Sequence, residues 1–221
     1  MSEDFSNWGD IGGWDVKKEP GPAIEESESE LSSSPRSSRR RTVPLYEISD
    51  KVEYRRAFSE LKLLEATELN QLEDGHSYHF LTCGDVDSIS FLMLVLQHLK
   101  RLDYCLFSTW VMAAEDVLRF CDWLKSGTIG RLDCYLGEHF PNQYRVEHRM
   151  LRDIVEGGGY GRVAHFRNHS KIMAGWCGER YFVIESSANI NTNPRTEQGV
   201  ITMDKGLALF YKDYFDGIKS F

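Results

Sequence analysis

The amino-acid sequence predicts an α/β domain with a mixed, mostly parallel sheet and helices on both faces. Strand-like and helix-like segments alternate along most of the chain, and the central strand-like segments are almost continuous apolar runs. Alternation is typical of strands joined by crossover helices, and continuous apolar runs are expected where both faces of a sheet are covered. A chain of 221 residues with 41% hydrophobic content can build one good core rather than two large ones.

Residues 1–44 are predicted to be a disordered tail, and residues 45–221 to form the domain. Four of the six prolines lie in the tail, with a Ser-rich run that is acidic first and basic second. Such a composition cannot bury enough apolar area to offset the entropy of the chain. Trp8 and Trp14 leave open a docking role toward a protein partner, and the arginine run 39–41 leaves open a contact with a phosphate backbone.

The domain begins with residues 54–72, whose apolar side chains recur at helical spacing and predict one or two helices. Strands and helices then alternate: strands are expected at 77–83, 104–111, 131–137 and 162–167, and helices at 88–101, 113–127 and 142–157. Asp87 is a candidate N-cap for the first of these three helices. Gly127 is placed to close the second.

The last third of the chain predicts a β-hairpin, a strand and a closing helix. Two apolar runs, 172–176 and 181–185, flank a charged Gly-Glu-Arg turn, which is a hairpin pattern. A strand is expected at 199–204 and a helix at 207–218.

Side chains suited to phosphodiester chemistry surround this hairpin. They are a histidine, a lysine, neutral hydrogen-bond donors, an arginine and a carboxylate: His169, Lys171, Ser186, Ser187, Asn189, Arg195 and Glu197. If the first two lie in a strand, their spacing places them on one face. A nucleophile or acid, a fixed cation, neutral donors and a carboxylate that orients the imidazole are the parts needed to attack a phosphodiester without a metal.

This stretch resembles the signature of the phospholipase D superfamily, which is His-x-Lys, a hairpin, Gly-Ser-x-Asn and a downstream Glu. The matching residues are His169, Lys171, Ser187, Asn189 and Glu197. Two positions depart from the signature. Trp176 stands where the family has Asp, five residues after the lysine, and Ser186 stands where it has Gly.

The resemblance implies a phospholipase D-like fold with two such motifs in each active site. The chain carries the full constellation once, so a two-fold homodimer would bring two copies together. His169 of one chain would attack phosphorus to give a phosphohistidine, and the second imidazole would protonate the leaving alcohol. Glu197 would hold the ring tautomer, while Lys171, Ser187 and Asn189 would bind the phosphoryl oxygens.

The predicted function is a metal-independent nuclease that acts on DNA or RNA without a cofactor. The chain has no apolar run near 18 residues and no secretory signal pattern, which predicts no membrane contact and a cytoplasmic location. The resemblance adds that small single-motif members are mainly nucleases, of bacterial or bacteriophage origin. Arg167 and Arg195 are candidates for binding a flanking phosphate, and Ser186 for a further substrate contact.

Two other functions stay open at this point. A catalytically degenerate protein that binds nucleic acid or assembles with other proteins is favoured by Trp176, by the net charge of −8 and by the long tail. A phospholipid head-group hydrolase is the other. The negative charge argues against a broad non-specific grip on DNA but is compatible with a local basic patch.

Five cysteines, none in a C-x-x-C pair, predict buried free thiols in a reducing compartment rather than a disulfide framework or a zinc site.

Overall fold

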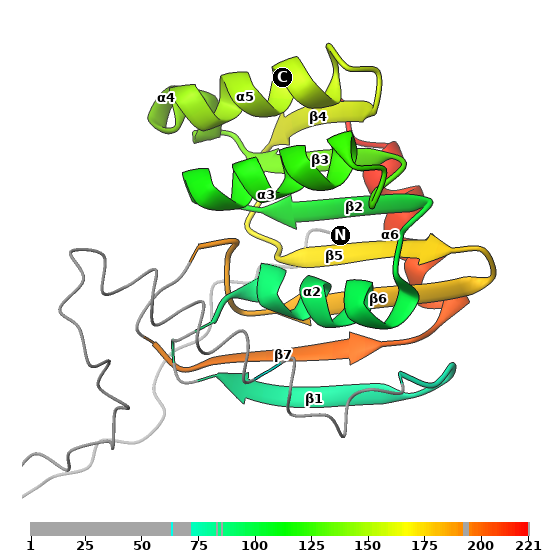
Figure 1. The fold of residues 1–221 in the computed structure, drawn as a ribbon. Coiled ribbons are helices and arrows are strands. Elements are labelled where there is room, and N and C mark those ends of the chain that lie inside the picture. Colours follow the sequence, from blue (N-terminus) through cyan, green and yellow to red (C-terminus); the bar gives the residue numbers. More distant parts are fainter. Residues whose placement is uncertain (1–62, 64–71, 83, 85, 192–194, 221) are drawn as a thin grey trace, which may run out of the picture. The chain divides into compact units, whose positions relative to one another are not determined.

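The computed structural model describes residues 63, 72–82, 84, 86–191 and 195–220 (Figure 1). Its centre is a seven-stranded sheet with the order β1-β7-β6-β5-β2-β3-β4. The strands are β1 (Ser77–Thr82), β2 (Tyr104–Thr109), β3 (Leu132–Gly137), β4 (Gly161–Phe166), β5 (Ile172–Cys177), β6 (Arg180–Ser186) and β7 (Glu197–Thr202). The predicted tail and nearly all of the predicted 54–72 helices lie outside the described residues.

The predicted mixed sheet is confirmed, and the structure shows where its parallel part lies. Five of the seven strands run in the same direction, and β5 and β7 oppose them. Because these two strands are interleaved with the others, only β2–β3 and β3–β4 are parallel neighbours. Parallel pairing needs crossover helices, and the helices that follow β2 and β3 supply them.

Helices cover both faces of the sheet, as predicted. They are α2 (Ser88–Leu99), α3 (Ala114–Lys125), α4 (Phe140–Gln143), α5 (Arg145–Val155) and α6 (Lys205–Asp216). Helices α2, α3 and α5 lie over one face, and α6 lies behind the other (Figure 1). Cys105 and Phe107 of β2 pack on the first side, and Tyr104 and Leu106 pack with α6. Every residue of β2 is therefore buried, which explains its unbroken apolar run.

Two aspartates fix the starts of helices. The Asp87 carboxylate accepts a hydrogen bond from the Ile89 amide at 3.1 Å, which confirms the predicted N-cap of α2. Asp204 does the same for α6 by accepting from the Leu207 amide at 2.6 Å. Each cap contributes about 1 kcal/mol. Gly127 has a φ of 74° just after α3, where it ends the helix at little steric cost.

The open edge of the sheet at β4 is covered by side chains. Glu156 accepts a hydrogen bond from the Val163 amide at 3.1 Å, and the Ser220 hydroxyl accepts one from the His165 amide at 3.0 Å. These bonds occupy amides that would otherwise be available to another strand.

The described cysteines are free thiols, in agreement with the sequence prediction. Cys105, Cys121 and Cys134 are buried and Cys177 is partly buried, while Cys83 lies outside the described residues. Burial raises the pKa of the Cys105 thiol, so this group is not a nucleophile at neutral pH. None of the helices in the described part of the chain is long and apolar enough to span a bilayer.

Candidate active site

The polar residues of the 169–197 stretch gather at one end of the strands, which is called the His169 edge below. Strands β2, β3, β4 and β6 end at this edge, and β5 and β7 begin there (left side of Figure 1). Strand β4 leads to His169, β5 follows Lys171, β6 leads to Ser187, and β7 begins at Glu197. Loops at strand ends carry functional groups on a rigid support, and this edge is the candidate active site.

Asn168 anchors the segment that crosses from β4 to β5. It is 4% exposed. Its NH2 group donates to the Ser108 hydroxyl at 2.8 Å and to the Tyr135 carbonyl at 3.1 Å. Its carboxamide oxygen accepts from the Ser170 amide at 2.9 Å and from the Ser170 hydroxyl at 2.7 Å. The residue between His169 and Lys171 is thereby tied to β2 and β3, so the backbone that carries both side chains is held in place.

His169 and Lys171 meet as predicted, but they do so in a loop rather than in a strand. The Lys171 ammonium nitrogen lies 3.0 Å from His169 Nδ1, and it also donates to the His169 carbonyl at 2.6 Å. The indole of Trp110 packs at 83° to the imidazole with ring centroids 4.8 Å apart. The imidazole is exposed and Lys171 is half-buried. Burial lowers the pKa of Lys171, and the nearby Glu197 carboxylate partly offsets this.

The two serines after β6 join it to the start of β7. The Ser187 hydroxyl donates to the Glu197 carboxylate and accepts from the Gln198 amide, the latter at 3.0 Å. The Ser186 hydroxyl donates to the Gln198 carbonyl at 3.1 Å and accepts from the Ala188 amide at 2.9 Å. Both hydroxyls are thus engaged, but Ser187 is exposed whereas Ser186 is half-buried.

Asn189 is held at the site by hydrogen bonds from residues at the end of β2. Its carboxamide oxygen accepts hydrogen bonds from the Trp110 amide at 3.3 Å and from the Thr109 hydroxyl at 3.4 Å. Because the oxygen is engaged, the NH2 group is the part of Asn189 that remains available as a donor. Trp110 thus connects Asn189 with the ring of His169.

Arg195 is exposed and lies two residues before β7, at the same edge. Residues 192–194 lie outside the described residues.

Sequence reasoning missed the support beneath the site. Asn168 stands directly before His169 without any periodic signal. Ser108 gave a weak sequence signal, because it is a hydroxyl residue inside an apolar strand. In the structure it is 2% exposed. Its oxygen lies 2.6 Å from the Ser170 hydroxyl, which shows that this buried polar residue serves the His-x-Lys segment.

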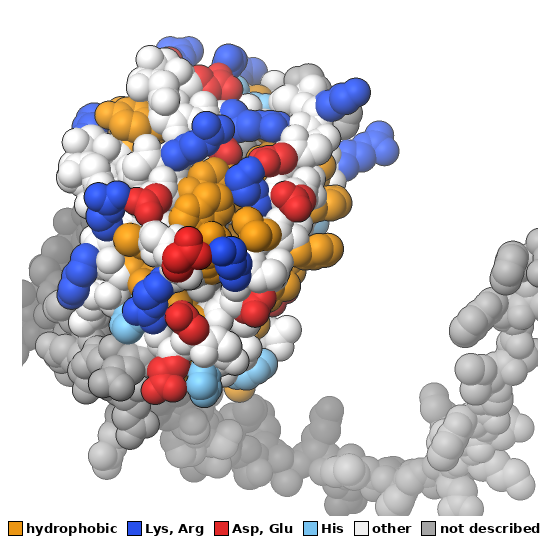
Figure 2. Space-filling view, turned by 90° about the vertical axis from the view of Figure 1, so that its right-hand side faces the viewer, with side chains coloured by type: hydrophobic (Ala, Val, Ile, Leu, Met, Phe, Trp, Pro, Cys, Tyr) orange, Lys and Arg blue, Asp and Glu red, His pale blue; other side chains and the backbone are white. Residues whose placement is uncertain are grey.

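The departure at Trp176 lies at the other end of β5. Five residues separate it from Lys171, which is about 16 Å along a strand. Its indole stacks on Tyr104 with centroids 4.4 Å apart and packs near Tyr181 at 5.5 Å. Figure 2 views this end of the molecule, where hydrophobic side chains are ringed by Lys, Arg, Asp and Glu. The departure from the signature at Trp176 therefore lies away from the groups of the candidate site.

The site combines an exposed imidazole, an adjacent ammonium, a hydroxyl bonded to a carboxylate and an amide donor. Together they supply a nucleophile or proton donor, a positive charge and neutral donors at one place. Within the described ranges, no group of three or more His, Cys, Asp or Glu side chains is placed to hold a metal ion.

Comparisons with known proteins find similar structures but no similar sequences. No family model matches the chain, and no curated protein does. Phosphatidylserine synthase of Haemophilus influenzae Rd KW20 is 12% identical over 62% of this chain and 36% of that protein, with a TM-score of 0.45. Polyphosphate kinase of Porphyromonas gingivalis is 14% identical over 86% of this chain and 32% of that protein, with a TM-score of 0.48. The chain spans about a third of each protein's length, and likeness at this level decides neither family nor function.

Proposed function

We propose that the protein is a metal-independent phosphodiester hydrolase, and specifically a nuclease, with His169 as nucleophile. The observation that carries the proposal is the contact of the Lys171 ammonium with an exposed His169 imidazole, at an edge where Ser187, Asn189 and Glu197 converge. A phosphodiester repels nucleophiles because its oxygens are anionic, and this arrangement offsets that charge.

In the proposed reaction, a ring nitrogen of His169 attacks phosphorus and a phosphohistidine forms. The bond from phosphorus to the leaving oxygen breaks, and that oxygen takes a proton from a second imidazole. Water then attacks phosphorus, gives its proton to the second imidazole and releases His169. Lys171 turns from the imidazole to the phosphoryl oxygens when substrate binds, and the NH2 group of Asn189 donates to the same oxygens.

The second imidazole would come from a second copy of the chain. The sequence has another His-x-Lys triplet, His98–Leu99–Lys100, but it ends α2 at the opposite edge of the sheet. It cannot face His169 within one chain. A two-fold dimer with both His169 edges facing each other supplies the two roles symmetrically.

A degenerate, purely binding protein is less well supported, because its main argument was the substitution at Trp176. That side chain packs on Tyr104, away from the His169 edge, so it removes no group from the proposed chemistry.

The test is hydrolysis of bis(p-nitrophenyl) phosphate and nicking of supercoiled plasmid by the purified chain in excess EDTA. His169→Ala should abolish both activities. His76→Ala should leave both intact, because His76 is exposed just before β1, at the other end of the sheet. Cleavage that EDTA abolishes would contradict the metal-free mechanism, and a monomeric mass in solution would contradict the shared site.

A further inference from the structure

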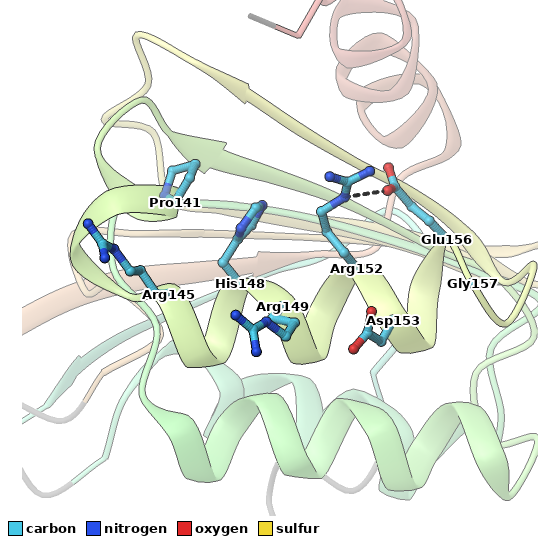
Figure 3. A pocket seen from close by; sticks show the side chains of 8 residues that line it. All are labelled: Pro141, Arg145, His148, Arg149, Arg152, Asp153, Glu156 and Gly157. Atoms are coloured by element: carbon cyan, nitrogen blue, oxygen red, sulfur yellow. Dashed lines mark hydrogen bonds and ion pairs between the residues drawn. The ribbon is translucent and has the colours of Figure 1, made fainter.

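A groove along the outer side of α5 carries a row of arginines that the proposed chemistry does not use. It encloses about 510 Å³. Arg145, Arg149 and Arg152 line it at successive turns of the helix (Figure 3). Spacings of four and three residues put side chains on one helix face, so the three guanidinium groups form a single row about 10 Å long at the Cα positions.

The charges in this row are only partly compensated. Arg152 is paired with Glu156, with its Nε 2.7 Å from a carboxylate oxygen (Figure 3). Arg145 and Arg149 are both exposed, and neither guanidinium group forms an ion pair or hydrogen bond with any described residue. Asp153 also lines the groove and reduces its net charge, but it makes no ion pair with either arginine. Two guanidinium groups thus remain available to an outside anion.

The groove wall is rigid. Glu156, besides holding Arg152, accepts the hydrogen bond from the Val163 amide of β4. The ring of His148, which also lines the groove, packs against His165 of β4 with centroids 4.7 Å apart. Burial and the charge of Arg152 lower the pKa of His148, so this ring is a neutral wall at physiological pH. The helix that carries the arginine row is therefore attached to β4, the strand that leads to His169.

The row starts at the edge of the sheet where the candidate active site lies. Strand β3 ends there at Gly137, opposite Phe166, and α4 and then α5 follow. His169 contacts the end of β2, two strands from β4, which is about 10 Å across the sheet. Along the axis of a duplex, where each strand rises about 3.4 Å per nucleotide, that distance spans about three nucleotides. Arg167 is exposed between β4 and His169, with no partner among the described residues.

We propose that this groove binds the phosphate backbone of a polynucleotide a few nucleotides away from the bond that is cut at His169. The proposal rests on the proposed function and extends it, because it makes a long polynucleotide, rather than a small diester, the preferred substrate. Evenly spaced arginines on an open helix face suit an extended polyanion with repeated phosphates.

The test compares two double variants of the full chain that lose the same charge. Arg145→Gln with Arg149→Gln empties the groove of its available cations. Lys100→Gln with Lys125→Gln removes two exposed lysines from the ends of α2 and α3, away from the His169 edge. Affinity for a fluorescent single strand of about 20 nucleotides is measured against salt, since each lost phosphate contact lowers the slope of log K against log salt by about 0.7.

The arginine variant should show a slope smaller by about 1.4, for two lost contacts, and the lysine variant should keep the wild-type slope. Arg145→Lys with Arg149→Lys should restore it, because the slope depends on charge. Hydrolysis of bis(p-nitrophenyl) phosphate should be equal in all variants. Equal slopes for the two glutamine variants would overturn the proposal, and so would arginine-dependent binding of polyglutamate without binding of the oligonucleotide.

A wild-type chain that hydrolyses neither diester would contradict the proposed function alone. All slopes are measured with His169→Ala added to each chain, so that no turnover consumes the oligonucleotide and the slopes still test the groove.

Discussion

The two ends of the sheet hold similar sets of charged and aromatic side chains but arrange them differently. At the His169 end, buried amides and hydroxyls hold the backbone, and the imidazole and the Ser187 hydroxyl are exposed. At the Trp176 end, a groove of about 530 Å³ is lined by aromatic rings and by cations that already have partners. Both ends have a lysine close to an aromatic or imidazole ring.

Each cation at the Trp176 end already has a partner within the protein. Arg131 lies 3.4 Å from the buried Asp133, Arg162 donates to the Ile218 carbonyl at 2.6 Å, and Lys212 pairs with Asp216. Of these cations, Arg162 and Lys212 join the α6 region to the sheet, because Arg162 extends from β4 and Lys212 of α6 also lies 5.5 Å from the centroid of the Tyr104 ring of β2. The comparison teaches that a pocket with suitable residue types is not by itself a candidate active site. What distinguishes the His169 end is that its reactive groups are exposed while the backbone beneath them is held by buried hydrogen bonds.

After the complete loss expected of His169→Ala, the largest effect is expected from Lys171→Met. Loss of the ammonium beside His169 should lower kcat/KM for bis(p-nitrophenyl) phosphate about 100- to 1,000-fold, because the phosphoryl charge is no longer offset. Lys212→Met at the other end should leave the rate unchanged. Initial rates of the two variants check this, and equal losses would erase the distinction between the two ends.

The next effect in size concerns the buried supports. Asn168→Ala removes five hydrogen bonds, and it should lower kcat about 10- to 100-fold with little change in KM, because His169 loses its fixed position. Each buried group left unsatisfied also costs about 1–3 kcal/mol of unfolding free energy. Tyr104→Phe, which removes a buried hydroxyl from Asp133 at the other end, should lower stability only. Urea unfolding together with kinetics separates the two outcomes.

A smaller effect is expected in the pH profile. Burial lowers the pKa of Lys171, so its proton is lost at a lower pH than that of an ordinary lysine, near 10.4. If the ammonium is required, kcat/KM falls as pH rises through this lowered pKa. Lys171→Arg should shift that alkaline limb to higher pH, since guanidinium stays charged. An unshifted limb would mean that another group controls it.

The smallest effect on activity is expected from Trp176→Phe. It should leave kcat unchanged and lower the unfolding free energy by about 1–2 kcal/mol, through weaker stacking on Tyr104. Trp176→Asp, which introduces the residue that the phospholipase D signature has at this position, should destabilise further without raising the rate. A gain in rate would show that this position acts on the site from a distance.

Much of the fold could be predicted from the sequence because local signals are strong. The alternation of apolar runs with amphipathic segments located strands β1 to β6, and Asp87 marked the start of α2 as it does in the structure. The strand order could not be predicted in this way. The position of β5 beside β2, and of β7 between β6 and β1, depends on contacts distant in the chain.

The site was predictable to the same extent. The pairing of His169 with Lys171 followed from their spacing, although the lysine folds back in a loop instead of sharing a strand face. The role of Asn168 did not follow, because its partners Ser108 and Tyr135 are 60 and 33 residues away. Such partners are fixed only when β2 and β3 are in place.

The position of Glu197 has a consequence for the stage of folding at which the candidate active site is completed. Glu197 belongs to a strand that pairs with β1, where it lies opposite Thr82. Contacts between such distant parts of a chain form late, after helices and local hairpins. During refolding, helical signal should therefore return first, and the hydroxyl–carboxylate pair of Ser187 and Glu197 should be completed only when β7 docks. The rate at which turnover is recovered would then report the rate at which β7 pairs with the rest of the sheet.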